Sequence, residues 1–349
     1  MALHTDFEPI FELTRGNTCE SIHWGAYAVV DVEGHLLASY GNPQAITYLR
    51  SSAKPFQALP LIEMGGKVKY DLTEEEIALT CASHSGTDEH VRIVQKIHRK
   101  VGLTQDQLLC GSHPPIHKPT RDTLIKHDED PSPYRHNCSG KHSGMLALTQ
   151  MLGANSKDYL NPQHPAQQLI LDVISEMCAV PLDQIAIGID GCSAPNFAIP
   201  LYSTALGFAR LCDPARAAIP LSPQRISACQ TITAAMVSNP EMIAGPDRFD
   251  TDLMRVGAGK VVSKGGAEGY QAMGLFPGAL SDTSPAIGVA MKITDGDPKD
   301  RARPAVAMRI LQELGVLSSQ DMETLSIYGP ELSIKNWRQL DVGRASPVY

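Results

Sequence analysis

The sequence predicts an α+β fold, with a sheet built from both ends of the chain and a helical region inserted between them. Apolar runs typical of strands lie at residues 22–41 and 261–293, toward the two ends. The middle of the chain carries repeated helix start and stop signals instead. Because strands and helices are segregated and do not alternate, the pattern favours α+β over an alternating α/β fold.

No internal repeat or low-complexity linker divides the 349 residues, so we expect a single domain over residues 1–349. The sheet region is expected at about 1–70 and 255–349, and the helical region at about 71–254.

The expected elements follow from local signals, beginning with a hairpin around Glu33-Gly34. A helix is expected just after Ser51-Ser52, because Pro55 in a first turn costs no hydrogen bond. Thr73 and Glu76 form a capping-box pattern before another apolar run. The later elements are a helix from Thr87, a helix beginning near Cys138, helices at 164–178 and 223–239, a buried strand at 185–190, and a last helix from Pro304 to Gly315.

The charge balance argues against two classes of partner. The chain has 30 Lys and Arg and 38 Asp and Glu, a formal net charge of −8. This balance lacks the excess of positive charge that is typical of proteins that bind nucleic acid or an anionic membrane. No run of 18 apolar residues predicts a transmembrane helix, and the start MALHTDFEPI has neither a basic nor an apolar export region. We therefore expect a cytoplasmic protein with reduced thiols.

The eight cysteines contain no Cys-x-x-Cys pair, which excludes zinc ribbons, thioredoxin-like motifs and haem attachment. Gly-x-Ser-x-Gly, His-Glu-x-x-His, the P-loop and Gly-x-Gly-x-x-Gly are also absent. The commonest hydrolase, kinase and dehydrogenase signatures are therefore excluded.

Three short motifs carry possible chemistry. Ser51 and Lys54 are three residues apart, so on a helix they share a face, and the lysine can accept the serine proton. Lys264-Gly-Gly is a weaker relative of the Lys-Thr-Gly found in β-lactamases, and Ser83 follows a capped helix and offers a second hydroxyl. Each also has a plain structural interpretation, as a helix start, a strand end and a polar turn.

Two cysteines have less ordinary surroundings. Cys138-Ser-Gly-Lys141-His142 places a thiol at a predicted helix N-terminus beside basic groups, which favours the thiolate. Either a nucleophilic Cys/His pair or a metal thiolate fits this pattern. Asp190-Gly-Cys192, at a predicted strand end, offers a second thiol and a carboxylate. Spacing alone does not show that Cys138 and Cys192 meet.

Taken together, the motifs are more specific than any one of them, and the chain resembles the Rhizobium-type L-asparaginases (class 3, the asparaginase II family). The resemblance rests on RSSAKPFQ (50–57), CASHSGT (81–87), HNCSGKHSG (136–144), DGCSAPNF (190–197) and KGGAEG (264–269). It implies a catalytic domain with a fold like that of serine β-lactamases and penicillin-binding proteins. It also implies hydrolysis of L-asparagine to L-aspartate and ammonia by a homodimer.

The resemblance further implies two Ser–Lys pairs, Ser51 with Lys54 and Ser83 with Lys264. We expect Ser51 to attack the carboxamide with Lys54 as its base, while Ser83 and Lys264 relay a proton to the leaving ammonia. Lys264, and not Lys260, is placed by the Gly-Gly-Ala-Glu-Gly that follows it.

A zinc ion is implied as well, held by Cys138, Lys141 and Cys192 with Asp190 close by. Two thiolates favour zinc over magnesium or calcium, and a lysine binds it only as the neutral amine. For substrate binding, Arg50 is the expected partner of the substrate carboxylate, because two parallel N–H groups of its guanidinium can bond both carboxylate oxygens. Contacts with the substrate or around the zinc are expected from His136, Asn137 and His142.

Two alternative functions remain open from the sequence. A serine β-lactamase or D-Ala peptidase would share the Ser-x-x-Lys motif, although Ser-Asp-Asn is absent. A non-catalytic zinc-binding, amide-sensing module would share the metal ligands. The preference for asparagine over glutamine depends on one methylene and on the shape of the pocket.

Overall fold

The computed structural model describes residues 6–349; the first five residues, part of the stretch in which we expect no export signal, lie outside the described residues. The chain forms two compact units. The first comprises the chain up to Ser52, Ile199–Ala218 and Asp252–Tyr349, and the second comprises Ala53–Ala198 and Ile219–Thr251.

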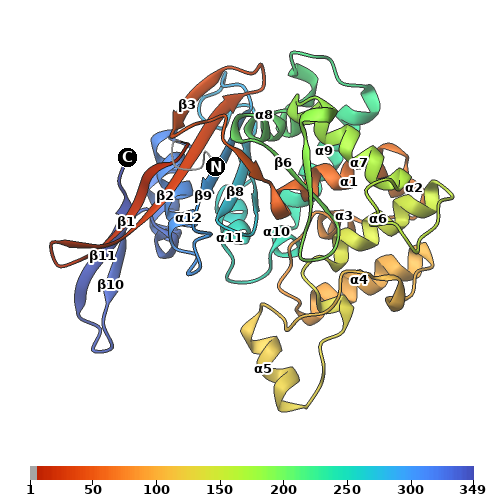
Figure 1. Cartoon of the computed structure of the whole chain (residues 1–349), viewed down its shortest axis with the longest axis horizontal. Helices are drawn as coiled ribbons and strands as arrows, with labels where there is room; N and C mark the ends of the chain where they lie inside the picture. The colour runs from red at the N-terminus through yellow and green to blue at the C-terminus, as the bar shows by residue number, and fades with distance from the viewer. Residues whose placement is uncertain (1–5) are drawn as a thin grey trace. The chain divides into compact units, whose positions relative to one another are not determined.

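The first unit contains an antiparallel sheet whose main path runs β10-β11-β1-β2-β9-β8-β7, with β3 paired to β2. Its N-terminal strands β1 and β2 therefore lie side by side between C-terminal strands, as red arrows between blue ones in Figure 1. The prediction of an α+β fold with a sheet from both chain ends is confirmed. The strands are β1 Glu8–Arg15, β2 Thr18–Asp31, β3 Leu36–Tyr40, β7 Val261–Gly265, β8 Tyr270–Leu275, β9 Ile287–Ile293, β10 Leu332–Lys335 and β11 Asp341–Pro347.

Two helices cover this sheet. Helix α8 (Leu201–Cys212) packs on β2, β8 and β9, and α12 (Ala302–Glu313) packs on β1, β8, β9 and β11. Gly288 on β9 allows α8 to approach closely, because a Cβ there would lie 1.7 Å from the Ala205 carbonyl oxygen. Helix α8 belongs to the sheet unit although it comes from the middle of the sequence. The unit also contains β4 (Ile46–Tyr48) and α13 (Ser319–Thr324).

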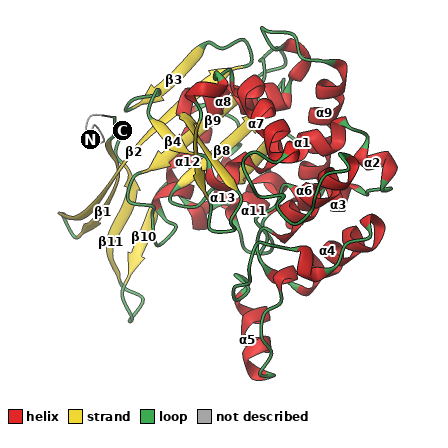
Figure 2. Cartoon of the chain, turned by 45° about the vertical axis from the view of Figure 1, so that its right-hand side comes forward, coloured by secondary structure: helices red, strands yellow, loops and turns green. Residues whose placement is uncertain are grey.

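The second unit is mainly helical. Helix α1 packs against α6, α7 and α9, and its buried face includes Phe56, Leu59 and Leu61. Figure 2 shows α5 standing away from the other helices of this unit. Its helices are α1 Lys54–Glu63, α2 Gly66–Lys69, α3 Glu74–Thr80, α4 Asp88–Val101, α5 Lys118–Lys126, α6 Ser139–Met151, α7 Pro165–Cys178, α9 Pro223–Ser238 and α10 Pro240–Ile243.

Local signals explain several of these boundaries. The Thr73 Oγ1 accepts from the Glu76 N–H at 3.4 Å, and the Glu76 carboxylate accepts from the Thr73 N–H at 2.7 Å, so the capping box at the start of α3 is confirmed. Strands β5 (Ala186–Ile189) and β6 (Pro195–Pro200) pair antiparallel. Helix α11 (Phe249–Val256) contains the point where the chain passes from the second unit into the first. Across residues 6–349, every helix is too short or too polar to cross a bilayer.

Candidate functional site

The predicted nucleophile lies in a tight turn just before α1. Arg50–Ala53 form a 3-10 turn that continues into α1, and the Ser51 side chain there is almost wholly buried. Arg50 has a φ of +52°, a conformation that costs a non-glycine residue free energy and is commonly found at functional sites. The predicted helix start is therefore a short 3-10 segment, and Lys54 is the first residue of the α-helix proper.

Ser52, which the motif analysis did not single out, fixes the strand that carries Lys264. Its Oγ donates to the Lys264 carbonyl oxygen at 2.7 Å. Gly266 makes this approach possible, since a Cβ there would lie 2.8 Å from the Leu49 carbonyl oxygen. The Lys264 side chain is buried and its Nζ donates to the Gly265 carbonyl at 2.7 Å, whereas Lys260 is exposed. Burial thus agrees with the choice of Lys264 over Lys260.

In the helical unit, the amine of Lys54 joins three groups from separate segments. The Lys54 Nζ donates to the Ala82 carbonyl oxygen at 2.6 Å, to the Ser83 Oγ at 2.7 Å and to the Cys138 Sγ at 3.2 Å. The side chain is 1% exposed. The structure therefore brings Lys54 and Ser83 together, a contact that the predicted pairing did not include. The pairs Ser51–Lys54 and Ser83–Lys264 each join the two units and stay predictions.

The two predicted zinc thiols meet in the same unit, although 53 positions of sequence separate them. Cys138 is the N-cap residue of α6, and Cys192 lies in the turn between β5 and β6. The pKa of the Cys138 thiol is held well below its usual value, mainly by a hydrogen bond with Cys192. Burial acts in the opposite direction, and the positive charges of Lys54 and Lys141 add to the lowering. A thiolate at this position also benefits from the helix N-terminus.

Lys141 completes this thiol–amine cluster, which we define as Lys54, Cys138, Lys141 and Cys192. Its Nζ donates to the Cys192 Sγ at 3.0 Å. Burial opposes the ammonium form, but the Cys192 and Cys138 sulfurs outweigh it and raise the pKa of Lys141, with a smaller contribution from Asp190. The Asp190 carboxylate accepts from the Gly191 N–H at 2.8 Å. Asp190 is thus close enough to Lys141 to influence its pKa, and its place beside a zinc ion stays a prediction.

The donor set of this cluster fits a zinc ion. Two sulfurs and one amine from different segments can supply three ligands and leave a fourth position open. Among the described residues, no group of three or more His, Cys, Asp or Glu side chains is placed to hold a metal, so a zinc site here would require the lysine. His142 adds a buried Nε2 atom, and its side chain interacts with the Cys192 thiol.

The predicted contact residues lie around the cluster. His142 is oriented by a 2.7 Å contact between its Nδ1 and the Tyr159 hydroxyl, and burial lowers the pKa of His142 to about 4. The Cys138 Sγ contacts the Asn137 Oδ1 at 3.3 Å, and the His136 Nδ1 accepts from the Cys138 N–H at 3.0 Å. Neutral imidazoles here leave acceptor nitrogens next to a thiol.

Sequence reasoning missed two histidines that support these groups. The His113 Nε2 accepts from the Asn137 N–H at 3.1 Å, and its ring centroid lies 4.4 Å from that of His136. The His84 Nε2 contacts the Ser139 Oγ at 2.9 Å in the first turn of α6. His84 lies within a quoted motif, but His113 comes from a Pro- and His-rich loop without a recognisable spacing, so no sequence signal pointed to its role.

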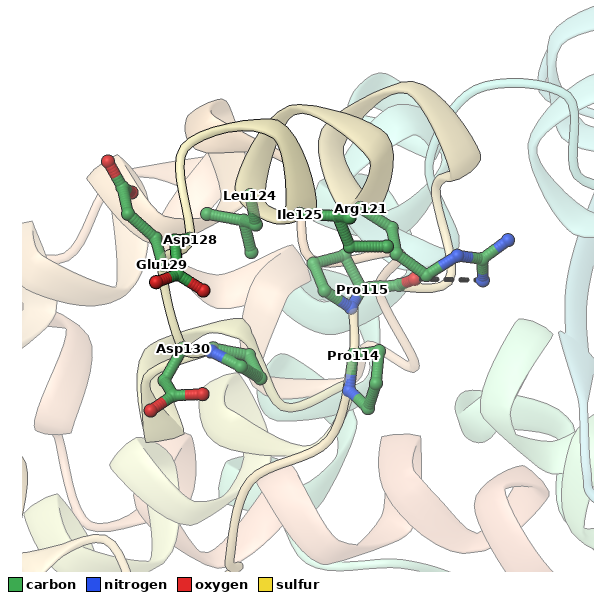
Figure 3. Close-up of a pocket in the computed structure, with 9 residues that line it drawn as sticks. Pro114, Pro115, Arg121, Leu124, Ile125, Asp128, Glu129 and Asp130 are labelled. Carbon is green, nitrogen blue, oxygen red and sulfur yellow. Dashed lines mark hydrogen bonds between the residues drawn. The ribbon is translucent and has the colours of Figure 1, made fainter.

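A hollow of about 290 Å³ near α5 lies apart from these groups. Figure 3 shows it between α5 and the loop that follows, with the Arg121 guanidinium turned away toward the Pro115 carbonyl oxygen. Its lining contains none of the predicted site residues; it consists of Pro114, Pro115, Arg121, Leu124, Ile125, Asp128, Glu129, Asp130 and Pro131. This hollow is therefore not the candidate reaction site.

Comparison with solved structures gives weak matches. The chain is 14% identical to a probable glutaminase from Bacillus subtilis complexed with 6-diazo-5-oxo-L-norleucine, covering 84% of this chain and 85% of that one at a TM-score of 0.42. It is 15% identical to a β-lactamase from Mycobacterium bovis, covering 83% and 95% at a TM-score of 0.43. At these values neither structure supports a functional inference. A search of curated proteins gives no match.

The family comparison is decisive. The sequence model described as L-asparaginase II matches residues 11–347, which is nearly the whole chain. The match spans every motif on which the resemblance rested, from the Ser51 turn to the Lys264 strand. The chain therefore belongs to the L-asparaginase II family of amidohydrolases.

Proposed function

We propose that the chain hydrolyses L-asparagine to L-aspartate and ammonia through a serine nucleophile activated by lysine. The observation that carries the proposal is the buried Lys54 amine, which contacts the Ser83 hydroxyl at 2.7 Å and the Cys138 thiol at 3.2 Å. Lys54 is three residues after Ser51 on a continuous 3-10 and α-helical segment. A lysine so placed can serve a serine in proton transfer.

The three hydrogen bonds that the Lys54 Nζ donates correspond to the ammonium form, so in the proposed reaction Lys54 first loses a proton. The Ser51 Oγ then attacks the carboxamide carbon while the neutral Lys54 amine takes the hydroxyl proton. Backbone N–H groups in the 3-10 turn are candidates to stabilise the oxyanion that forms. The C–N bond then breaks, and the departing ammonia receives a proton through Ser83 and Lys264. Water hydrolyses the resulting aspartyl ester and regenerates Ser51, so the net reaction consumes one water molecule.

Zinc is proposed as the metal of the thiol–amine cluster, held by Cys138, Lys141 and Cys192. When bound, zinc would supply positive charge that polarises and orients a ligand near the substrate. Lys141 would have to lose a proton to bind it, since its hydrogen bond to Cys192 and its raised pKa favour the ammonium form. Serine, not metal-bound water, is the nucleophile in this proposal.

Substrate recognition is proposed for Arg50, Asn137 and His142. The His142 Nε2 is buried beside the Cys192 thiol and can bond a polar atom of the substrate. Asn137 is held by His113 on one side and contacts Cys138 on the other. Arg50 offers a guanidinium to the substrate carboxylate. A homodimer is proposed as well, and light scattering coupled to size-exclusion chromatography would measure its mass.

The test is ammonia release from L-asparagine by Ser51→Ala, with the exposed serine variant Ser227→Ala as a matched control. We expect Ser51→Ala to lose at least about a thousandfold in kcat, because the nucleophile is gone. Near-native turnover by Ser51→Ala would refute the assignment. L-glutamine and a penicillin serve as competing substrates. Preferred penicillin hydrolysis would favour the β-lactamase alternative, and ligand binding without ammonia release would favour the sensing module.

A further inference from the structure

The sheet unit contains a cavity that the proposed reaction does not use. Its volume is about 240 Å³. It is lined by residues of β4, β9 and the turn after β7, together with the start of the described chain: Phe7, Ile46, Thr47, Tyr48, Arg50, Glu268, Lys292 and Thr294. Ser51, Lys54, Ser83 and Lys264 are not part of this lining. Arg50 is the one residue shared with the proposed substrate contacts.

Two cations and one carboxylate line the cavity, and the Asp295 carboxylate also acts on Lys292. The Arg50 Nη1 lies 3.7 Å from the Glu268 Oε1, a loose ion pair in which the glutamate is largely exposed. The Lys292 Nζ donates to the carbonyl oxygens of Glu268 and Ile293, which are neutral partners. Burial lowers the pKa of Lys292, the Glu268 and Asp295 carboxylates oppose this effect and Arg50 adds to it slightly. An anion in the cavity would further favour the charged amine.

A buried hydroxyl in the same wall also lacks a partner. Thr47 is 8% exposed, and its Oγ1 has no hydrogen-bond partner among the described residues. Buried polar groups are nearly always hydrogen-bonded, because an unpaired one costs about 1–3 kcal/mol. An acceptor group in the cavity would give the Thr47 hydroxyl a partner after a rotation about χ1.

The remaining wall is apolar and partly open to solvent. Phe7 is buried, whereas Ile46 and Tyr48 on β4 are 62% and 43% exposed. A ligand with an apolar group would cover these side chains and remove their surface from water. The polar carboxamide of asparagine does not match such a wall. The cavity therefore combines cationic groups at one part of its lining with an apolar surface at another.

We propose that this cavity binds a small monocarboxylate that carries an apolar group, at a site that shares only Arg50 with the one proposed for asparagine. The carboxylate lies against Arg50 and Lys292 and accepts from the Thr47 hydroxyl. The apolar group packs on Phe7, Ile46 and Tyr48. The ligand could be an amino acid or a simple carboxylic acid, and Glu268 distinguishes the two. Its carboxylate would attract the α-ammonium of an amino acid but repel a second negative charge on a simple acid.

The experiment is titration calorimetry of the intact protein with three probes that share one apolar body. 3-Phenylpropanoate carries the carboxylate, L-phenylalanine adds an α-ammonium, and 3-phenylpropan-1-ol lacks the charge. We expect one site per chain for 3-phenylpropanoate and at least about tenfold weaker binding of the alcohol, because the charged hydrogen bonds are lost. If L-phenylalanine binds more tightly than 3-phenylpropanoate, the natural ligand is an amino acid. If it binds more weakly, the natural ligand is a simple carboxylic acid. Equal binding of the alcohol, or no binding of either carboxylate, would overturn the proposal.

Variants outside the catalytic set locate the site. Lys292→Met should weaken the binding of 3-phenylpropanoate at least about tenfold, and Thr47→Val should weaken it about threefold. Lys292→Arg should retain most of the affinity, because it keeps the positive charge. Lys67→Met, which removes an exposed lysine of the helical unit, is the matched control and should change nothing. Unchanged binding in both Lys292→Met and Thr47→Val would place the probe elsewhere and refute the site.

Kinetics distinguish this cavity from the substrate pocket. The KM for L-asparagine should change by less than about twofold in Lys292→Met and Thr47→Val, because neither residue is assigned to substrate binding. A KM that rises in parallel with the loss of 3-phenylpropanoate affinity would make the cavity part of the substrate site and overturn the claim that the two sites share only Arg50. Calorimetry does not depend on turnover, so a failure of the proposed asparaginase activity would leave this test intact.

Discussion

Both units of the molecule bury polar groups, but the two buried networks differ in their chemistry. In the sheet unit, the Arg303 guanidinium donates to Asp300 at 2.8 and 2.9 Å and to the Gln271 amide oxygen, and the Gln271 Nε2 donates to the Ser263 Oγ at 2.9 Å. In the helical unit, the buried network around Lys54 contains thiols, amines and imidazoles. Only the second set contains groups whose charge changes readily near neutral pH.

This difference separates a network that holds a structure from one that can transfer protons. A guanidinium stays charged at every working pH, and its partners are a carboxylate and neutral amide and hydroxyl groups. The network around Arg303 therefore fixes β7 and β8 relative to α12 without taking part in proton exchange. The Lys54 amine, in contrast, lies within hydrogen-bonding distance of a hydroxyl and a thiol, each of which can gain or lose a proton.

The largest expected effect comes from removing Lys54. Lys54→Met keeps much of the side-chain volume but removes the amine, so kcat/KM for L-asparagine should fall about 10³–10⁴-fold with a smaller effect on folding. Arg303→Met is the matched control from the sheet unit. It should lower the free energy of unfolding by about 3 kcal/mol, because it leaves buried partners unpaired, while the folded fraction keeps its kcat/KM.

Ammonia release and urea unfolding, measured on both variants, make the comparison direct. If Arg303→Met lost activity per folded molecule as severely as Lys54→Met, the distinction between a structural and a reactive network would fail.

The next effect concerns zinc. Cys138→Ser and Cys192→Ser should each weaken zinc binding at least about a hundredfold, since a hydroxyl is a poor substitute for a thiolate ligand. Cys229→Ser is the control, because Cys229 is a buried thiol of the same unit whose pKa burial raises to about 12. Elemental analysis after dialysis against zinc gives the stoichiometry. Full retention of zinc by either cluster variant would refute the ligand set.

The sequence predicted the segregated architecture because helix and strand signals are local. The Thr73–Glu76 capping box is one such signal, and it is present in the structure. The short motifs of the sequence likewise contain the residues that meet in the helical unit, namely Lys54, Ser83, Cys138, Lys141 and Cys192. Their grouping depends on long-range packing, as does the placement of Ile199–Ala218 against the sheet. The division at 71 and 254 therefore differs from the observed units, and the single-domain expectation stays a prediction.

The roles of Ser52 and His113 lay beyond sequence reasoning for a related reason. Ser52 acts through one hydrogen bond to the carbonyl oxygen of Lys264, 212 positions away, and no residue type or spacing in the sequence predicts this contact. His113 positions Asn137 through its ring nitrogen from a loop without regular structure. Side chains that support a site through a single distant contact leave no periodicity, and only the folded chain reveals them.

The smallest expected effect is a pH dependence of stability from the buried histidines of the helical unit, among them His90 and His98. Burial lowers the pKa of both His90 and His98 to about 4 from an ordinary value of 6.5. In the unfolded chain these imidazoles take up protons near pH 6.5, so below that pH the unfolded state binds more protons than the folded state. Stability should therefore be full above pH 6.5 and fall as the pH drops toward 4.

By pH 5 each histidine should cost about 2 kcal/mol of unfolding free energy, and urea unfolding at pH 7.5, 6 and 5 measures this slope. His98→Gln should reduce it, because glutamine cannot gain a charge yet can still bond the Ser143 hydroxyl, which the His98 Nε2 contacts at 3.0 Å. The exposed His127→Gln variant should leave the slope unchanged. An unaltered slope in His98→Gln would mean that acid destabilisation comes from other groups, and the helical unit would lose this distinction from the sheet unit.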